Sequence, residues 1–502
     1  MTALLAQATG INAPIRFPNV EYSVLVPEIT LVVGALVILM VASLSRRRHG
    51  SGLYAGLTIV TGVVALGSAA NLWNRVSAHG PSLAVAKAVA VDGFSMFFLV
   101  LISITVVLGA LLAESYVRRE DLPAPEFFVL LLLSASGGML MASANDLIVL
   151  FLGLEILSIA LYVLAGYHAR REASREAAMK YFVLGAFSSA IFLYGIALTY
   201  GATGTTNLGE IAVFLSNNVL SHNGVLLAGM GLMLVGLGFK VAAVPFHTWT
   251  PDVYQGSPSP VTGFMAAAAK AAGFAGLLRV FFSGLSSLQL DWRPVVFVMA
   301  VLTLAVGSVL ALVQTDVKRM LAYSSISHAG YVLVGLQAAS KKGIAGSLFY
   351  LLAYTFMVLG SFAVVTLVGR RGDAHHSLDD YRGLAARRPG LALVFTVFLM
   401  AQAGVPFTSG FLAKFYVIAA AVDRHSYALA IVAMLGAAVA AFFYLRIVIL
   451  MYGPAAEGEE PAAIAIPRTA GAALAICLAF TVVVGLLPSP VIDFARHATL
   501  LF

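Results

Sequence analysis

Charged residues are scarce in this chain. Asp, Glu, Lys and Arg together make up 11% of its 502 residues, whereas 60% of the residues are hydrophobic and the mean hydropathy is +0.95. Soluble domains usually carry about a quarter of their residues as charged side chains. The composition therefore excludes an ordinary soluble protein and indicates an integral membrane protein.

Cysteine is almost absent, because Cys477 is the only one. One thiol excludes a disulfide within the chain and the cysteine set that an iron–sulfur cluster needs. The sequence also lacks a P-loop and a G-x-G-x-x-G turn between a strand and a helix, which are the usual signals of nucleotide binding. We therefore expect that this chain binds no cofactor or metal, and that the thiol of Cys477 only packs.

Long apolar runs fill most of the sequence. A run of about 18 apolar residues is long enough to cross a hydrocarbon layer about 30 Å thick. Fourteen such runs lie near residues 24–45, 53–72, 94–115, 127–143, 146–167, 178–203, 224–249, 258–282, 294–314, 320–338, 344–369, 391–422, 427–451 and 469–489. The loops between them are short and the beginning lacks a signal-peptide pattern. We expect one all-α polytopic membrane domain over residues 1–502, inserted whole.

Basic residues are distributed unevenly between the two sides of the predicted bundle. Loops after odd-numbered runs hold sixteen Lys and Arg residues, including Arg46–Arg48, whereas the tails and the even loops hold eight, including Arg16. Cytoplasmic loops carry the excess of Lys and Arg. The pattern predicts that both ends of the chain lie outside the cytoplasm. It also explains the net charge of +7 without nucleic acid as a partner.

Four charged side chains lie inside apolar runs: Glu155 in LIVLFLGLEILSIALYVL, Lys240 in GLMLVGLGFKVAAVPFHTW, Lys270 in VTGFMAAAAKAAGFAGLL and Lys414 in GVPFTSGFLAKFYVIAAAV. A charge near the centre of a bilayer costs about 2.5–3.5 kcal/mol, and such groups usually face a bundle interior or a water-filled path. Desolvation disfavours the charged form of a lysine, and a nearby carboxylate favours it. A chain of such groups is suited to proton transfer, with the three lysines as its strongest members.

Two similar segments predict breaks in the helices. VPFHTW in the seventh run and VPFTSGF in the twelfth both place Pro and Phe next to a lysine, and the twelfth run is longer than a straight crossing requires. Discontinuous helices at corresponding positions of two halves are typical of ion sites in transporters built from inverted repeats. We therefore expect helices seven and twelve to be broken.

The longest polar loop, about residues 370–389, contains two adjacent histidines. His375 and His376 lie near Asp373, Asp379 and Asp380, a composition that would also suit a metal ion. Adjacent histidines on a solvated loop are more often ordinary surface residues. We favour the surface interpretation.

Several motifs together resemble one known family. FKVAAVPFHTWTPDVYQGSPSPVTGFMAAAAKAAGF, FLGLEILSIALYVLAGY, EAAMKYFVLGAFSSAIFLYG, QTDVKRMLAYSSISHAGYVLVG and AQAGVPFTSGFLAKFYV are similar to the antiporter-like subunits of proton-pumping NADH:quinone oxidoreductase, respiratory complex I. The form WTPDVYQGSP is similar to the subunit N family in particular. The resemblance covers roughly residues 130–450, and the remainder matches only in hydropathy.

The resemblance implies a fourteen-helix fold with two inverted five-helix repeats, at residues 127–283 and 294–451, and broken helices seven and twelve. It also implies a set of proton-transfer residues. Glu155 would pair with Lys180, Lys240 would lie at the break of helix seven with His247 after it, Lys270 would link the two half-channels, His328 would lie on the central polar axis, and Lys414 would release protons from helix twelve.

The same resemblance implies partners and cofactors. NAD, FMN, iron–sulfur clusters and quinone would belong to other subunits, and this chain would couple quinone reduction there to proton transfer as a non-redox subunit of the bacterial plasma membrane. Other membrane subunits of complex I would cover its flanks. An alternative is a subunit of a multisubunit cation/proton antiporter without redox coupling, and a third is a passive scaffold in such a complex.

Structural roles remain open for several of these residues. Glu155 and Lys180 could form an ion pair that only joins two helices, and Lys180 could extend to the membrane surface. His247 could be an interfacial residue, and His328 could simply bind a neighbouring helix. Lys318 and Arg319 are best interpreted as orientation anchors near the membrane surface. Arg279 and Arg446 lie toward the ends of their runs, and we expect their side chains to extend to the membrane surface.

Overall fold

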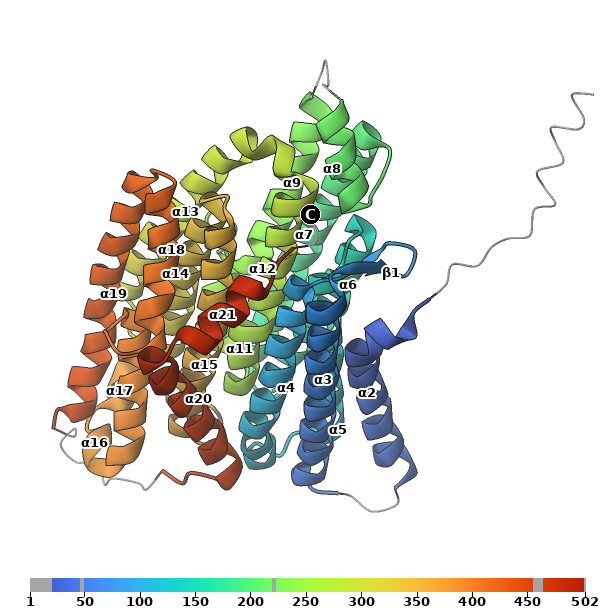
Figure 1. The fold of residues 1–502 in the computed structure, drawn as a ribbon. Helices are drawn as coiled ribbons and strands as arrows, with labels where there is room; N and C mark the ends of the chain where they lie inside the picture. The colour runs from blue at the N-terminus through green and yellow to red at the C-terminus, as the bar shows by residue number, and fades with distance from the viewer. Residues whose placement is uncertain (1–19, 46–48, 219–222, 455–463, 501–502) are drawn as a thin grey trace, which may run out of the picture.

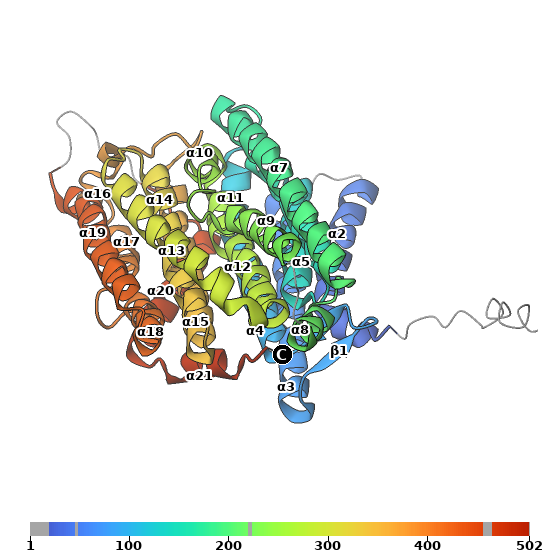
Figure 2. The ribbon, with the colours of Figure 1, turned by 90° about the horizontal axis from the view of Figure 1, so that it is seen from above.

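The computed structural model describes residues 20–45, 49–218, 223–454 and 464–500, which form a bundle of long helices (Figures 1 and 2). Twelve helical segments in this part of the chain are long and apolar enough to cross a membrane. They are α2 (Val26–Leu44, with the turn η2 before it), α3 (Ser51–His79), α4 (Gly93–Arg119), α5 (Ala124–Ser143), α6 (Leu147–Ala165), α7 (Glu172–Thr203), α9 (Gly224–Val241), the segment Ser259–Gly284, α13 (Gln289–Leu312, with the turn η5 before it), α15 (Lys341–Val368), α19 (Tyr427–Tyr452) and α20 (Arg468–Leu486).

Two further crossings complete the predicted set. α14 (Val317–Gln337) has 21 residues but is more polar, since it begins with basic residues and contains SSISH. α17 (Pro389–Ala403) and α18 (Ser409–Asp423) are the two halves of an interrupted crossing. Every predicted run therefore coincides with helix, and the all-α polytopic fold class is confirmed. The division into repeats at residues 127–283 and 294–451 stays a prediction.

The two ends of the bundle differ in their loops. The end that carries α16 (Leu384–Arg387), the lower end in Figure 1, also carries the last turn of α4, with Arg118 and Arg119, and the loop after α6, with Arg170 and Arg171. We call it the arginine-rich side. Arg16 and residues 46–48, which contribute to the predicted orientation, lie outside the described residues.

The opposite end holds elements that the sequence did not indicate. β1 (Ser82–Ala84) and β2 (Val89–Val91) form an antiparallel hairpin, and α8 (Leu208–Asn217) lies nearby. The amide of Asn145 donates to the carbonyl of Lys87 in the hairpin turn (2.9 Å). Strands of three residues are too short for an alternating pattern to stand out beside long apolar helices.

Helix seven is interrupted immediately after Lys240. α9 ends at Val241, Ala242 has a φ of 62°, and α10 (Trp249–Gly256) begins only after VPFHT. Pro245 has no N–H to donate and cannot continue the helical hydrogen bonding. The predicted break is confirmed.

Helix twelve is interrupted in a similar way before Lys414. α17 ends at Ala403, Gly404 has a φ of 94°, and α18 begins at Ser409. A Cβ at Gly404 would lie 3.0 Å from Cδ of Lys414, so a glycine suits both the backbone conformation and the close approach of the lysine. This predicted break is confirmed as well.

Helix eight changes from a π-helical to an α-helical turn at Lys270. It consists of α11 (Ser259–Phe264), the π-helical turn η3 (Met265–Ala269), α12 (Lys270–Arg279) and the π-helical turn η4 (Val280–Gly284). Such wider turns occur often at functional sites. Figure 2 shows α11, α12 and α15 between α4, α5 and α9 on one side and α13, α17, α18 and α19 on the other, and the most apolar stretches of helix eight and α15 are fully buried.

A buried ion pair joins α4 to helix eight near the hairpin. Two guanidinium nitrogens of Arg279 donate to the two carboxylate oxygens of Asp92, each at 2.9 Å, and Nε donates to the carbonyl of Ala142 (3.1 Å). The side chains of Arg279 and Asp92 are 1% and 0% exposed. Arg279 therefore does not extend to the membrane surface, and that interpretation was wrong, because its partner lies 187 residues away in sequence.

We expect Arg279→Met to destabilise the fold by about 3–5 kcal/mol, because it leaves the carboxylate of Asp92 buried without its counter-charge. The measurement is the thermal transition of the purified protein in detergent. Asp92→Asn combined with Arg279→Met should recover part of the loss. Glu21→Gln, which breaks the half-exposed pair with Arg75 (3.2 Å), serves as control and should cost under about 1 kcal/mol. An unchanged transition in Arg279→Met would contradict the role of the pair.

Candidate functional site

Three lysines lie buried in the interior of the bundle. Lys240 at the end of α9, Lys270 at the start of α12 and Lys414 in α18 are 6%, 3% and 6% exposed. Among the described residues, none of the three has a carboxylate within ion-pair distance. They are therefore desolvated cations without a direct counter-ion, and their partners are neutral.

The neutral partners are hydroxyls, carbonyls and aromatic rings. Nζ of Lys240 donates to Ser158 (2.8 Å) and to the hydroxyl of Tyr181 (3.3 Å). Nζ of Lys270 donates to the carbonyl of Ser325 (2.6 Å) and also contacts its hydroxyl, and Nζ of Lys414 donates to the carbonyl of Ala403 (2.7 Å).

Each lysine also lies over an aromatic ring, which attracts a cation through its negative face. Lys240 lies 5.6 Å from the ring centre of Tyr181, Lys270 5.8 Å from that of Tyr354 and Lys414 4.9 Å from that of Tyr331. The three sites are therefore built alike.

Glu155 is an acidic group whose charge acts on this set. It lies half-buried on α6, one turn before Ser158, and its charge acts on Lys240. Its Oε1 is buried and has no hydrogen-bond partner within the described chain. The structure thus associates Glu155 with Lys240.

The predicted pairing of Glu155 with Lys180 is not formed. Nζ of Lys180 lies 2.7 Å from Asp252 in α10 and 2.7 Å from Glu176, one turn earlier on α7. Lys180 is close to the beginning of α7, so its side chain extends to the arginine-rich side, where it is 41% exposed. Asp252 was missed because only the tertiary fold brings it to Lys180.

A polar cavity of about 350 Å³ opens at this place. Asp252 bridges two helices here, because it also accepts a hydrogen bond from Arg319 of α14 (2.6 Å). Arg319 is therefore an ion-pair partner rather than only an orientation anchor. The polar residues that line the cavity are Arg171, Glu176, Lys180, Asp252, Gln255, Asp316, Arg319, Asp373 and His376.

His328 lies between Lys270 and Lys414, and both lysines act on it electrostatically. Its Nδ1 lies 2.6 Å from the hydroxyl of Tyr350 and its Nε2 3.2 Å from that of Tyr444. The position of His328 on a central polar axis, which the resemblance implied, stays a prediction.

Tyr444 and Gln402 extend this polar axis and were missed in the sequence. The hydroxyl of Tyr444 contacts that of Ser324 and donates to Oε1 of Gln402 (3.4 Å), and the amide of Gln402 donates to Ser361 of α15 (2.7 Å). Gln402 is a lone amide in the apolar run of α17, a signal that could have found it.

His247 lies in the break after α9 and does not join the other site residues. It is half-buried, and its Nδ1 has no hydrogen-bond partner within the described chain. The proton-carrying role of His247 stays a prediction.

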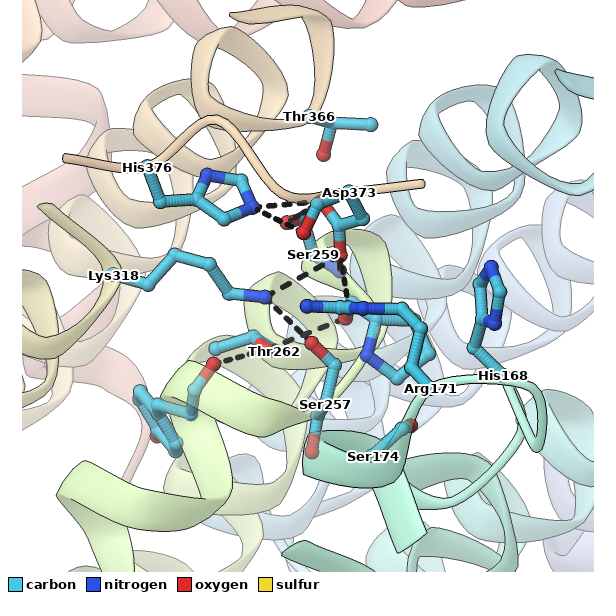
Figure 3. Close-up of polar contacts among 12 residues, drawn as sticks. His168, Arg171, Ser174, Ser257, Ser259, Thr262, Lys318, Thr366, Asp373 and His376 are labelled. Atoms are coloured by element: carbon cyan, nitrogen blue, oxygen red, sulfur yellow. Dashed lines mark hydrogen bonds and ion pairs between the residues drawn. The ribbon is translucent and has the colours of Figure 1, made fainter. Parts of the chain in front are cut away.

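The polar loop after α15 differs from its predicted surface position. His376 is 4% and Asp373 0% exposed, and Nε2 of His376 lies 2.9 Å from the carboxylate of Asp373 (Figure 3). Of the two histidines, His375, paired with Asp380 at 3.0 Å, is the one that lies near the surface. Within the described residues, no group of three or more His, Cys, Asp or Glu is arranged to hold a metal ion.

Comparison with known proteins places these features in a family. The sequence model described as "NADH:quinone oxidoreductase/Mrp antiporter, TM" matches residues 144–440. The chain is 42% identical over 489 residues to NADH-quinone oxidoreductase subunit N of Trichlorobacter lovleyi, covering 97% of this chain and 99% of that relative.

Solved structures agree with this placement. A chain of respiratory complex I from Thermus thermophilus is 34% identical, with a TM-score of 0.78 and coverage of 94% of this chain and 99% of that one. A chain of the Mrp complex from a Dietzia species, at 21% identity and a TM-score of 0.83 over 95% of this chain and 96% of that one, shares the fold. With its buried lysines at helix breaks and this similarity over nearly its full length, the chain belongs to the subunit N family of NADH-quinone oxidoreductase.

Proposed function

We propose that this chain is the non-redox subunit that carries protons across the membrane while partner subunits reduce quinone. The observation that supports the proposal is the set of three buried lysines without a carboxylate partner, each held by hydroxyls or carbonyls, with His328 under the electrostatic influence of two of them. A desolvated lysine changes its proton affinity when a carboxylate approaches or withdraws. Charge movement at one end of the set can therefore drive proton transfer along it.

The transfer begins at Glu155 and Lys240. Movement of the half-buried carboxylate of Glu155 toward Lys240 favours its ammonium form, and withdrawal favours proton release. Ser158 and Tyr181 hold the nitrogen of Lys240 in both of its protonation states, because a hydroxyl can accept a hydrogen bond from an ammonium and donate one to a neutral amine. In this proposal, water between Lys240 and Lys270 carries the proton from one amine to the other.

The second half of the transfer runs from Lys270 to Lys414. His328 lies between them, and its ring can accept a proton on one nitrogen and release it from the other. The hydroxyls of Tyr350 and Tyr444 hold the two nitrogens. Lys414 releases the proton through the break of helix twelve, on the side opposite to the arginine-rich one.

Lys180, Asp252 and Arg319 have a different role in this proposal. They surround the polar cavity on the arginine-rich side, which we place in the cytoplasm of a bacterial cell, with both chain ends outside. Their opposite charges hold the mouth of the cavity together and keep it wet, and His247 lies in the adjacent break. Protons enter here.

Two inverted repeats fit this transfer. Asp146 caps α6 and forms a β-bridge with Asn207, and Asp316 caps α14 and forms a β-bridge with Ser377. The first bridge lies at the hairpin side and the second at the arginine-rich side. Such a correspondence supports repeats at residues 127–283 and 294–451, in opposite orientation.

The redox chemistry belongs to partners in this proposal. NAD, FMN, iron–sulfur clusters and quinone reside in other subunits, and the outer helix faces contact lipid or neighbouring membrane subunits. A cation/proton antiporter without redox coupling would use the same lysines. Purification from native membranes separates the two, because only the proposed function requires NADH-oxidising subunits to come with this chain.

We expect Lys240→Met to lower NADH-driven proton transport by about ten-fold, because it removes the first protonatable group of the transfer. The measurement is the pH gradient that membrane vesicles build with NADH, normalised to the NADH:ferricyanide rate as a measure of assembled complex. Lys342→Met is the matched control, since Lys342 is half-exposed and paired with Asp423. Undiminished transport in assembled Lys240→Met would favour a passive scaffold.

Asp252→Asn and Lys180→Met should each reduce transport by about two- to five-fold, and the double variant should lose no more than either, because the two groups act as one pair. Proton transport per NADH oxidised is measured in vesicles for the wild type, for each single variant and for the double variant. Glu210→Gln is the control, since this carboxylate is 54% exposed, pairs with Lys87 at 3.8 Å and lies away from the cavity. Losses that multiply in the double variant would show that the pair does not act as a unit.

A further inference from the structure

A groove on the hairpin side of the bundle is lined by both basic and apolar side chains. It lies between α15, α18 and α21 (Ser489–His497), and its volume is about 510 Å³. Figure 2 shows α21 beside the ends of α15 and α18. The residues that line the groove are Lys341, Lys342, Ala345, Gly346, Phe415, Tyr416, Ala419, Ile492 and Arg496. A mostly apolar pocket with a few polar groups is the usual form of a ligand site.

The groove lies at the level where the apolar layer of the membrane begins. α15 starts at Lys341 with Ser340 as its cap, and its apolar sequence starts at Ile344. α21 packs against α15 here, with Ile492 buried and Arg496 exposed. A groove at this depth can hold a charged group at its outer end and an apolar chain at its inner end.

Small residues and aromatic rings form an apolar strip that leads inward from the groove. Ala345, Gly346 and Ala419 are small residues at the place where α15 packs against α18. Phe415 is 55% exposed, and its ring stacks with that of Phe411, with the ring centres 6.4 Å apart. Phe411 lies deeper in the membrane, because α18 runs from the break of helix twelve to the hairpin side. The strip therefore continues toward the interior of the bilayer.

The charges in and around the groove do not cancel. Lys342 pairs with Asp423 (2.5 Å) and Arg496 with Asp493 (3.5 Å), whereas Lys341 has no carboxylate within ion-pair distance among the described residues. Asp423 and Asp493 are the only acidic residues in α15, α18 and α21. Three cations and two carboxylates leave one positive charge, which is that of Lys341.

The predicted orientation of the chain does not explain these cations. Sixteen Lys and Arg residues lie in the loops of one side and eight on the other, and Lys341, Lys342 and Arg496 are among the eight. Basic residues favour the cytoplasmic side of a membrane. A group of them on the opposite side therefore acts against the predicted orientation, and a ligand of opposite charge would account for its position.

We propose that this groove binds one anionic phospholipid from the leaflet on the hairpin side. The phosphate lies against Lys341 and Arg496, and an acyl chain follows Phe415 and Phe411 into the membrane. Ammonium and guanidinium groups form strong charge-assisted hydrogen bonds to phosphate, and basic pockets between membrane helices bind the headgroups of anionic lipids. The lipid thereby joins α15, α18 and α21. This site goes beyond the proposed function, because it requires no proton transfer.

The test uses the whole purified complex in phosphatidylcholine vesicles that contain a small fraction of photoactivatable phosphatidylglycerol, with the reactive group in the upper acyl chain. After irradiation, labelled peptides are identified by mass spectrometry. We expect label on the peptides that contain Phe415–Ala419 and Ile492–Arg496. A photoactivatable phosphatidylcholine with the same chains should label them about five-fold less, because its headgroup has no net negative charge.

Variants identify the groups that bind the lipid. Lys341→Gln combined with Arg496→Gln should lower the phosphatidylglycerol labelling of both peptides about ten-fold, because the phosphate loses its two cationic donors. Ala419→Leu keeps every charge but fills the groove, and it should also lower the labelling. Lys87→Gln is the matched control, since Lys87 is a 66% exposed lysine in the hairpin turn, on the same side but outside the groove. Its labelling should equal that of the wild type.

Three outcomes would overturn the site. Equal labelling by phosphatidylglycerol and phosphatidylcholine would show an ordinary lipid-facing surface, and absence of label in the wild type would show that a partner subunit covers the groove. Labelling that Lys341→Gln with Arg496→Gln leaves unchanged would refute the role of the cations. All values are normalised to the NADH:ferricyanide rate as a measure of assembled complex. None depends on proton transport, so failure of the lipid site and failure of the proposed function are separate results.

Discussion

Burial of lysines without a carboxylate partner is the constraint on which the rest of this structure depends. A charge at this depth costs about 2.5–3.5 kcal/mol on insertion scales. Lys240, Lys270 and Lys414 offset part of that cost with hydroxyls, carbonyls and the faces of tyrosine rings within 6 Å. None of these partners carries a charge that would fix the proton, so the position of the nitrogen is secured while its protonation stays variable.

The same constraint explains why the helices are irregular at the lysines. Inside an unbroken α-helix each carbonyl already accepts a backbone N–H, so an ammonium can only share one, as Lys270 shares that of Ser325. The break of helix twelve leaves the carbonyl of Ala403 for Lys414, and the turn at Gly404 gives the side chain room. Lys240 ends one half of helix seven, and Lys270 follows a π-helical turn. Irregular backbone is thus placed where a polar group must be held inside the membrane.

The sequence predicted the parts that depend on local pattern. Apolar runs located the crossings, Pro and Gly beside VPF located both breaks, and isolated lysines stood out against apolar neighbours. It did not predict partners that only the tertiary fold brings together. Lys180 pairs with Asp252 across 72 residues and Arg279 with Asp92 across 187. The burial of Asp373 was also hidden, since a polar loop looks solvated until helices from both halves close around it.

The cations of this chain fall into two groups that differ in their partners rather than in their chemistry. Near the ends of the bundle, Arg279 and Lys180 each have a carboxylate within ion-pair distance, which favours the charged form and makes these groups fixed charges. In the interior, Lys240, Lys270 and Lys414 have none. A lysine can therefore be structural or exchangeable on the same helix bundle, and the presence of a carboxylate decides which.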